Sequence, residues 1–396
     1  MINEHYVDML KERSVIRAIS ERAAARRAEV GEQHVFDFSI GNPSVPTTHD
    51  FTEAMIDLYE TESPIALHGY SPSTGLPVFT QAVADSLNRR FGMDYEPSHI
   101  YPTSGATAAL AHAFRAVTKP GDEMITFAPY FPEYRPYSEA AGLTLTVLPC
   151  DPKDFQIDFA ALEQAMNPNV QAILINTPNN PSGAVYSAAT LQRLADLMRA
   201  KQEEYGHAIF LISDEPYREI TFDGAEQPYP SKFYDNTLSC YSFSKSLSLP
   251  GERIGYVAVN PKAEQADIFG PMFTQISRCT GHNCPGASIQ RAVARVIDET
   301  ADLAVYGKNM ELLYDTLIEL GFEVVRPGGT FYMFPKALED DANAFCEKAM
   351  HYDLFMVPSD SFGMPGYVRM SFCLDTSKVE AAIPALRRFV TEVYGR

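Results

Sequence analysis

Lys245 stands at a position where a charged side chain is costly. It follows the apolar start of the stretch "YSFSKSLSLPGERIGY" (241–256), which is typical of a buried strand. Burying an ammonium group is unfavourable unless a partner takes up its charge or its pKa falls. Ser242 and Ser244 precede the lysine, and Arg253 follows it by eight residues. Two hydroxyls and a guanidinium suit a phosphate, which leaves the lysine amine free for another bond.

Other polar side chains also come directly after predicted strands. The turn "PNNPSG" (178–183) presents Asn180, and "SDEPY" (213–217) presents Asp214 and Tyr217 after an apolar run. Taken singly, turn chemistry and a buried salt bridge explain these residues without any ligand. Because ligands of open α/β sheets bind beyond the carboxyl ends of the strands, we expect the three side chains to meet there.

The small-residue turn "SGAT" (104–107) opens a helical pattern and gives a candidate phosphate site. Such a turn leaves the backbone N–H groups of Ala106 and Thr107 free at the positive end of a helix dipole, although a simple N-cap is the alternative. The whole set combines anion donors, a carboxylate, a phenol, an amide and a lysine. Pyridoxal 5′-phosphate, with its phosphate, basic ring nitrogen, phenolic oxygen and aldehyde, fits them all.

Strand-like and helix-like segments alternate along the chain, and they are the elements that must position these groups. The apolar runs "QAILINT" (171–177), "HAIFLIS" (207–213) and "LSCYSFS" (238–244) are separated by helical patterns such as residues 188–206. Strands buried by helices on both faces are typical of an α/β fold with a largely parallel sheet.

Near residue 290 the pattern changes to a mixture of helices and short strands, which predicts a second unit. We therefore predict a large cofactor-binding domain over residues 46–289, with a mostly parallel mixed sheet flanked by helices. Residues 1–45 and 290–396 are predicted to form a smaller α+β domain, which includes a helix over about 5–29.

Composition limits the classes of partner. The net charge is −19, which argues against nucleic acid, and no apolar run approaches the ~18 residues of a membrane span. The six cysteines form no CxxC pair and are typical of reduced thiols, so we expect a soluble cytoplasmic protein. The cluster Cys279, His282 and Cys284 lacks a fourth metal ligand and the usual spacing, so we predict no metal site and leave its role open.

The patterns "SxSKxxxxxxxR", "NNPSG" and "DEPY" together carry a resemblance to one family. From about Phe38 to Phe372 the chain resembles the class I aminotransferases of the pyridoxal-phosphate fold type I group, near the aspartate and aromatic aminotransferases. The resemblance implies a transaminase that moves an amino group between an L-amino acid and a 2-oxo acid by a ping-pong mechanism.

The resemblance also implies a role for each cofactor-binding residue. Lys245 forms a Schiff base with the cofactor and later shuttles the proton, Asp214 keeps the pyridine nitrogen protonated, and Tyr217 binds the phenolic oxygen. Asn180 binds the same oxygen, and Phe131 stacks on the ring, with Tyr130 as the neighbouring candidate. The phosphate is held by Ala106, Thr107, Ser242, Ser244 and Arg253.

On the substrate side, the resemblance implies that Arg369, in "YVRMSF", clamps the α-carboxylate and that Asn180 and the backbone of Gly41 also contact it. For Gly41 a plain turn before Pro43 is the alternative. Tyr70, in "HGYSPSTGLP", is implied to reach the phosphate of a neighbouring subunit, which predicts a homodimer with shared active sites. An ordinary loop aromatic is the alternative for Tyr70.

The substrate and the reaction outcome are less constrained. A lysine of some dicarboxylate-specific relatives is Thr107 here, and the aromatic residues of "GGTFYMF" and "DSFG" favour an apolar or aromatic substrate; Arg17, a second cation to consider, is expected to be solvated. A C–S β-lyase on the same scaffold stays open. A non-catalytic sensor is disfavoured, because such regulators carry a DNA-binding module ahead of this domain and too few residues precede Phe38 here.

Overall fold

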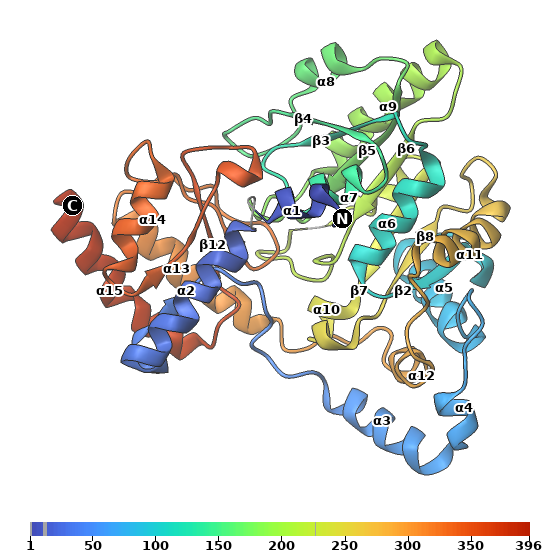
Figure 1. Ribbon diagram of the computed structural model, residues 1–396, viewed down its shortest axis with the longest axis horizontal. Coiled ribbons are helices and arrows are strands. Elements are labelled where there is room, and N and C mark those ends of the chain that lie inside the picture. The colour runs from blue at the N-terminus through green and yellow to red at the C-terminus, as the bar shows by residue number, and fades with distance from the viewer. Residues whose placement is uncertain (1, 11–13, 226) are drawn as a thin grey trace.

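The computed structural model describes residues 2–10, 14–225 and 227–396, and a seven-stranded sheet dominates it (Figure 1). The strand order is β2-β8-β7-β6-β5-β3-β4, and β8 runs antiparallel to both of its neighbours while the other pairs are parallel. This confirms the predicted α/β class with a mostly parallel mixed sheet. The strands are β2 (Ile100–Thr103), β3 (Glu123–Phe127), β4 (Thr144–Leu148), β5 (Val170–Asn176), β6 (Phe210–Asp214), β7 (Thr237–Ser242) and β8 (Gly255–Val259).

Helices cover both faces of this sheet, because successive side chains of each strand point to opposite faces and both sets are apolar. Leu174 and Ile212 pack on the face under α6 and α11, whereas Ile173 and Leu211 pack on the opposite face with α8 and α9. The helices around the sheet are α3 (His49–Thr61), α4 (Pro64–His68), α5 (Pro77–Phe91), α6 (Ala106–Val117), α7 (Tyr134–Glu139), α8 (Phe159–Ala165), α9 (Ala188–Tyr205), α10 (Phe243–Ser246), α11 (Phe269–Thr280) and α12 (Ala287–Arg295).

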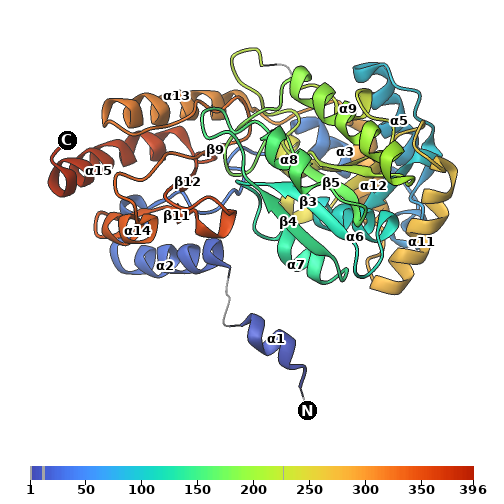
Figure 2. The ribbon, with the colours of Figure 1, turned by 90° about the horizontal axis from the view of Figure 1, so that it is seen from above.

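The C-terminal part of the chain builds a second core with small sheets of its own. Strands β11, β12 and β9 form an antiparallel sheet, and β1 pairs in parallel with β10. Figure 2 shows α2 beside α14, far from it in sequence, and the Arg22–Glu347 ion pair joins these two helices. The elements are β1 (Phe36–Asp37), β9 (Tyr332–Met333), β10 (Leu354–Phe355), β11 (Val357–Pro358), β12 (Val368–Ser371), α13 (Ala304–Glu319), α14 (Ala342–Met350) and α15 (Thr376–Tyr394). The domain limits 46–289, and 1–45 with 290–396, stay a prediction.

The N-terminal region corrects one expectation. Instead of one helix over about 5–29, the chain forms α1 (Glu4–Met9) and α2 (Val15–Val30), and residues 11–13 lie outside the described part. Ser14 is not helical and precedes α2, which buries Ile19 and Ala23, whereas α1 buries no side chain. Helical propensity alone therefore did not set the length of this segment, because packing supports only the second helix.

Candidate active site

A cleft of about 330 Å³ lies beyond the carboxyl ends of β5, β6 and β7, where open α/β sheets bind their ligands. The structure brings all of the predicted site residues except Tyr70 to its walls. They are Gly41, Ala106, Thr107, Phe131, Asn180, Asp214, Tyr217, Ser242, Ser244, Lys245, Arg253 and Arg369.

Lys245 enters the cleft from α10, the short helix that follows β7. The hydroxyl of Ser242 caps this helix by accepting a hydrogen bond from the backbone N–H of Ser244 at 3.2 Å. The two hydroxyl oxygens lie 2.6 Å apart. The Lys245 Nζ donates to the carbonyl oxygen of Gly41 at 2.6 Å and lies 5.3 Å from the centre of the Phe331 ring.

The walls of the cleft change the acidity of this amine. Burial lowers the pKa of Lys245 to about 8; nearby Cys373 opposes the decrease, and the positive charges of Arg369 and Arg253 add to it. The amine has no carboxylate partner among the described residues. A substantial neutral fraction near neutral pH makes Lys245 a competent nucleophile and base.

Asp214, the last residue of β6, offers one free carboxylate oxygen to the cleft. Its Oδ2 accepts a hydrogen bond from the hydroxyl of Tyr134 at 2.5 Å, and its buried Oδ1 has no partner in the described part of the chain. Burial raises the pKa of Asp214 to about 7; the Tyr134 bond lowers it and the neighbouring Glu215 raises it. A cationic N–H donor at Oδ1 would satisfy this oxygen and favour the carboxylate.

Asn176 connects this carboxylate to the Asn180 turn. Its side-chain amide donates to the Asp214 backbone oxygen at 2.8 Å, and its Oδ1 accepts from the Asn180 N–H at 2.6 Å. The Asn180 Oδ1 in turn accepts from Arg369 Nη1 at 3.2 Å. Residues from β5, β6 and β12 are thus held in one network.

Arg369, on β12, is a buried cation that no carboxylate of the described residues neutralises. Its Nη2 donates to the Ser39 carbonyl oxygen at 2.5 Å, and its buried Nε has no partner in the described residues. Its guanidinium carbon lies 4.6 Å from the centre of the Tyr332 ring and 5.2 Å from that of Phe362. A buried cation without a counter-charge, facing a cleft, is poised to bind an anion.

Tyr217 and Gly41 meet at Tyr332. The hydroxyl oxygens of Tyr217 and Tyr332 lie 3.3 Å apart in buried surroundings. A Cβ at Gly41 would clash with the Tyr332 hydroxyl, so only glycine allows the chain to pass so close to it.

The N-terminus of α6 forms the far wall. Gly105 caps this helix without a side-chain hydrogen bond, so the first N–H groups, near Ala106 and Thr107, are available to a ligand. A Cβ at Gly105 would lie 2.8 Å from the Arg253 Nη2, and the φ of Gly105 is +82°. Arg253 therefore sits directly against the turn, as the resemblance requires for a phosphate cradle.

Several residues of the site escaped the sequence analysis. Asn176 could have been found, since it ends a clear strand, whereas Tyr134, which donates to Asp214 without lining the cleft, gave no signal in its own segment. Ile16 and Tyr137 gave no signal of their own, because neither belongs to a strand end.

The weaker predictions have mixed outcomes. Phe131 lines the cleft, whereas the Tyr130 hydroxyl accepts a hydrogen bond from Arg135 and this residue is not a cleft-lining one. Arg17 is exposed, as expected, and its neighbour Ile16 is the one at the cleft. Tyr70 is fully exposed outside the cleft of its own chain.

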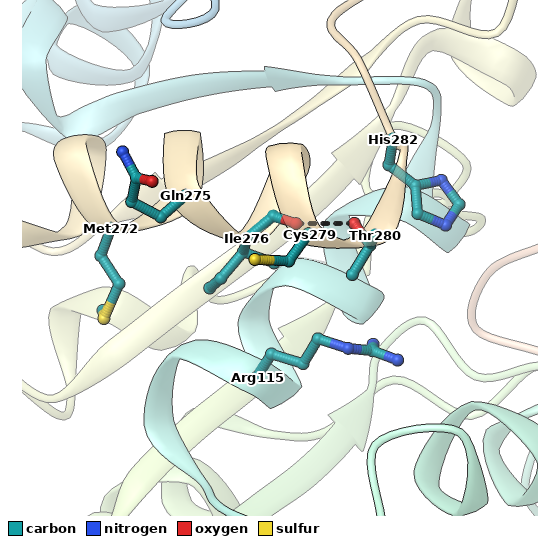
Figure 3. A pocket seen from close by; sticks show the side chains of 7 residues that line it. All are labelled: Arg115, Met272, Gln275, Ile276, Cys279, Thr280 and His282. Atoms are coloured by element: carbon teal, nitrogen blue, oxygen red, sulfur yellow. Dashed lines mark hydrogen bonds between the residues drawn. The ribbon is translucent and has the colours of Figure 1, made fainter.

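A larger cavity, about 560 Å³, lies between α6 and α11, and Figure 3 shows its side chains. Its one charged group, Arg115, already donates to the carbonyl oxygens of Ala111 and Ala140. Cys279 and His282 line it, but no group of three or more His, Cys, Asp or Glu among the described residues could hold a metal ion. The reactive and charged side chains therefore gather in the smaller cleft.

Comparison with known proteins identifies the family of this chain. The family model described as aminotransferase class I and II matches residues 33–386. An aspartate aminotransferase of Geobacillus stearothermophilus is 29% identical over 94% of this chain and 95% of its own. An aromatic-amino-acid aminotransferase of Thermococcus litoralis is 26% identical over 91% and 93%.

A solved structure of an amino transferase from Eubacterium rectale has a TM-score of 0.96 and 43% identity, and the match covers 100% of this chain and 99% of that one. Within the described residues, no helix combines the length and apolar character needed to cross a membrane.

Proposed function

The chain belongs to the class I and II aminotransferases, and from this premise we propose that Lys245, Asp214 and Arg369 carry its amino-group transfer. The aminotransferase activity and the family predicted from the motifs are confirmed, and the family depends on pyridoxal 5′-phosphate. One observation carries the proposal: a single cleft presents the Lys245 amine, an unpartnered oxygen of Asp214 and the unneutralised Arg369.

The residues fit the cofactor. The free Oδ1 of Asp214 would accept a hydrogen bond from a protonated pyridine nitrogen, and Tyr217 and Asn180 would hold the phenolic oxygen. Phe131 would cover one ring face. The first turn of α6, with Ser242, Ser244 and Arg253, would hold the phosphate.

When bound, pyridoxal phosphate supplies an electron sink for the charge that develops on the substrate Cα. Lys245 would hold the aldehyde carbon through its amine until an amino acid takes its place. The released amine would then remove the proton from the substrate Cα and, once protonated, would return a proton to the cofactor carbon. A pKa near 8 gives Lys245 a neutral fraction for the first transfer and a protonated form for the second.

The substrate α-carboxylate would bind Arg369, with the amide of Asn180 and the backbone of Gly41 beside it. The Nη2 bond to Ser39 and the Nη1 bond to Asn180 set the plane of the guanidinium before the substrate arrives. Two half-reactions, one with an amino acid and one with a 2-oxo acid, then use the same cleft, so the kinetics should be ping-pong.

We further propose an uncharged, apolar or aromatic substrate side chain. Ile16, Ile40 and Tyr332 line the same cleft as Arg369, and Thr107 offers no charge. Lys245, Arg253 and Arg369 are the cations that line the cleft in the described part of the chain, and each already has another use. A distal carboxylate would therefore find no further cation among the described residues that line the cleft.

We also propose a homodimer. Ile56, Tyr59, Ile65 and Tyr70 are exposed on α3, α4 and the loop that follows α4, which leaves apolar surface for a second copy to cover. In such a dimer Tyr70 would serve the cleft of the partner.

A spectral titration with each amino acid tests the function. An aminotransferase is expected to change its cofactor absorbance once per site without a 2-oxo acid, whereas a β-lyase would release pyruvate and ammonia over many turnovers. Borohydride reduction followed by peptide mass spectrometry should place the cofactor on Lys245, and a label elsewhere would refute the assignment.

Mixing Lys245→Ala chains with Tyr70→Ala chains tests the shared site. If Tyr70 acts across the interface, the mixed dimer has one site with both native residues, and activity returns. Activity equal to the average of the two variants would contradict this part of the proposal.

A further inference from the structure

The strap, residues 39–42, is a wall of the cleft that no secondary structure supports. Phe38 is still tied into the second core, since its N–H donates to the Phe355 oxygen and its own oxygen accepts from the Ser371 N–H, each at 2.8 Å. Beyond Phe38, residues 39–42 make no backbone–backbone hydrogen bond with the described chain. Their positions must therefore be fixed by side chains.

Three side chains donate to the carbonyl oxygens of the strap, and the Asp37 carboxylate accepts a hydrogen bond from the Ser39 N–H at 3.0 Å. Arg369 donates to Ser39 at 2.5 Å and Lys245 donates to Gly41 at 2.6 Å. The Cys373 Sγ lies 3.2 Å from the Asn42 oxygen, with the Ile40 oxygen farther away at 3.8 Å.

Two of these three anchors are also the groups that the proposed function uses. Arg369 keeps further N–H donors for a substrate carboxylate, including the Nε that has no partner in the described residues, so its bond to Ser39 can persist. Covalent use of the Lys245 amine, in contrast, removes its donation to Gly41. Cys373 is fully buried and is not a cleft-lining residue, so no ligand competes for its thiol.

Resting on the proposed function, we propose that Cys373 is a positioning residue that holds the strap while Lys245 and Arg369 are engaged in the reaction. Its thiol fixes Asn42, one residue beyond Gly41, and so keeps Gly41 against the Tyr332 hydroxyl. A strap that drifted outward would move Ile40 and Gly41, which both line the cleft.

The chemistry of the thiol suits this role. Burial raises the pKa of Cys373 to about 11; the Ser371 hydroxyl and the charges of Lys245 and Arg369 lower it. The thiol therefore keeps its proton and remains a donor at neutral pH. Because it has one proton, it serves one carbonyl at a time, and the Ser371 hydroxyl at 3.0 Å supplies a second contact to the sulfur.

Cys346 offers a matched control. It lies in the same hydrophobic core as Cys373 and is 1% exposed, against 0% for Cys373, but no hydrogen bond joins it to the strap in the described part of the chain. Replacing either cysteine by alanine removes one sulfur atom from the same core, so the two losses of stability should be similar.

Steady-state kinetics of the holoenzyme give the first test. We expect Cys373→Ala to raise the KM for the amino acid about fivefold, the scale of one lost neutral hydrogen bond, with a smaller change in kcat. Cys373→Ser, which keeps a donor, should recover most of the loss, and Cys346→Ala should leave KM unchanged. Equal kinetics in the two alanine variants, or no recovery by serine, would overturn the inference.

Hydrogen exchange of the full chain, with and without cofactor, gives a test that needs no turnover. The Ser39 amide, the strap amide whose N–H has an acceptor in the described chain, should exchange faster in Cys373→Ala than in Cys346→Ala, and more so once the cofactor occupies Lys245. If borohydride labels no lysine but this difference in exchange persists, the proposed function fails while the anchoring role stands. If Lys245 is labelled and strap exchange is the same in both variants, the anchoring role fails alone.

Discussion

The two sides of the cleft are built in different ways. The cofactor side uses residues at the ends of β5, β6 and β7 and the first turn of α6, so each group inherits its position from the large sheet. The substrate side joins the strap to β9 and β12, and its bonds cross long stretches of sequence. Lys245 and Gly41 are 204 residues apart, and Arg369 and Ser39 are 330 apart.

The two sides also carry opposite unsatisfied charges. The cofactor side holds the free Oδ1 of Asp214, and the substrate side holds the buried Arg369 with an unpartnered Nε, as judged within the described residues. The first suits a cationic ring nitrogen and the second suits a carboxylate. Rigid elements support the first, whereas side-chain hydrogen bonds support the second, so we expect the substrate side to be the more easily displaced.

Lys245→Ala should give the largest effect, because this residue serves both sides. It removes the covalent attachment and the general base together, so turnover should fall by about 10⁴-fold or more and the cofactor absorbance should change. Lys119→Ala, at an exposed surface position, is the control and should be unaffected. Residual turnover within tenfold of the native enzyme would contradict the assignment.

Asp214→Asn tests the cofactor side through the pH dependence of the free energy of unfolding. In the cofactor-free protein the pKa of Asp214 is about 7, whereas that of an aspartate in an unfolded chain is about 4. The protonated carboxyl therefore contributes its full stabilisation of the fold below about pH 4. This contribution is lost as the pH rises through 7, by roughly 4 kcal/mol in total. Asparagine does not titrate, so the variant lacks this loss. The free energy of unfolding of the native protein should therefore fall relative to that of the variant between pH 4 and 7.

Urea unfolding at a series of pH values measures this difference. Saturating cofactor should reverse the trend in the native protein, since a protonated ring nitrogen beside Oδ1 favours the charged carboxylate. Parallel stability curves for the two proteins would show that Asp214 has an ordinary pKa.

Arg369→Lys tests the substrate side. Lysine keeps the charge but loses the planar guanidinium, so kcat/KM for the amino acid should fall about 100-fold, while cofactor binding changes little. Arg387→Lys, whose native guanidinium pairs with Glu319 at the surface, is the matched control. If Arg369→Lys loses cofactor affinity while kcat/KM is unchanged, Arg369 does not belong to the substrate side alone.

Tyr134→Phe should give the smallest effect. It removes the hydrogen bond to Asp214 Oδ2, which lowers the pKa of that carboxyl, so the pKa should rise further and cofactor affinity should weaken about tenfold. Tyr130→Phe, next to it in the same motif but bonded to Arg135, is the control for the loss of a hydroxyl. An equal effect of both variants on cofactor affinity would exclude this role for Tyr134.

Residues on the cofactor side were more readily predicted from the sequence than contacts between distant segments. Strand limits were predicted to within a few residues for β5, β6 and β7, and Asp214 and Lys245 followed because they stand directly behind apolar runs. Tyr134 was missed, because no pattern in its own segment indicates that its hydroxyl donates to a carboxylate 80 residues away. The single helix expected at the N-terminus was wrong for a related reason, since packing decides which part of a helical pattern is supported.

The sequence by itself determined the family, the α/β class and the residues at the ends of the strands, because periodicity and turn residues are local properties. Only the tertiary structure decided that the strap meets Lys245 and Arg369, that Ile16 reaches the cleft and that Tyr70 faces away from it. These facts depend on how distant segments pack against each other. A local pattern states which face of an element is apolar, but it does not state which other segment will cover that face.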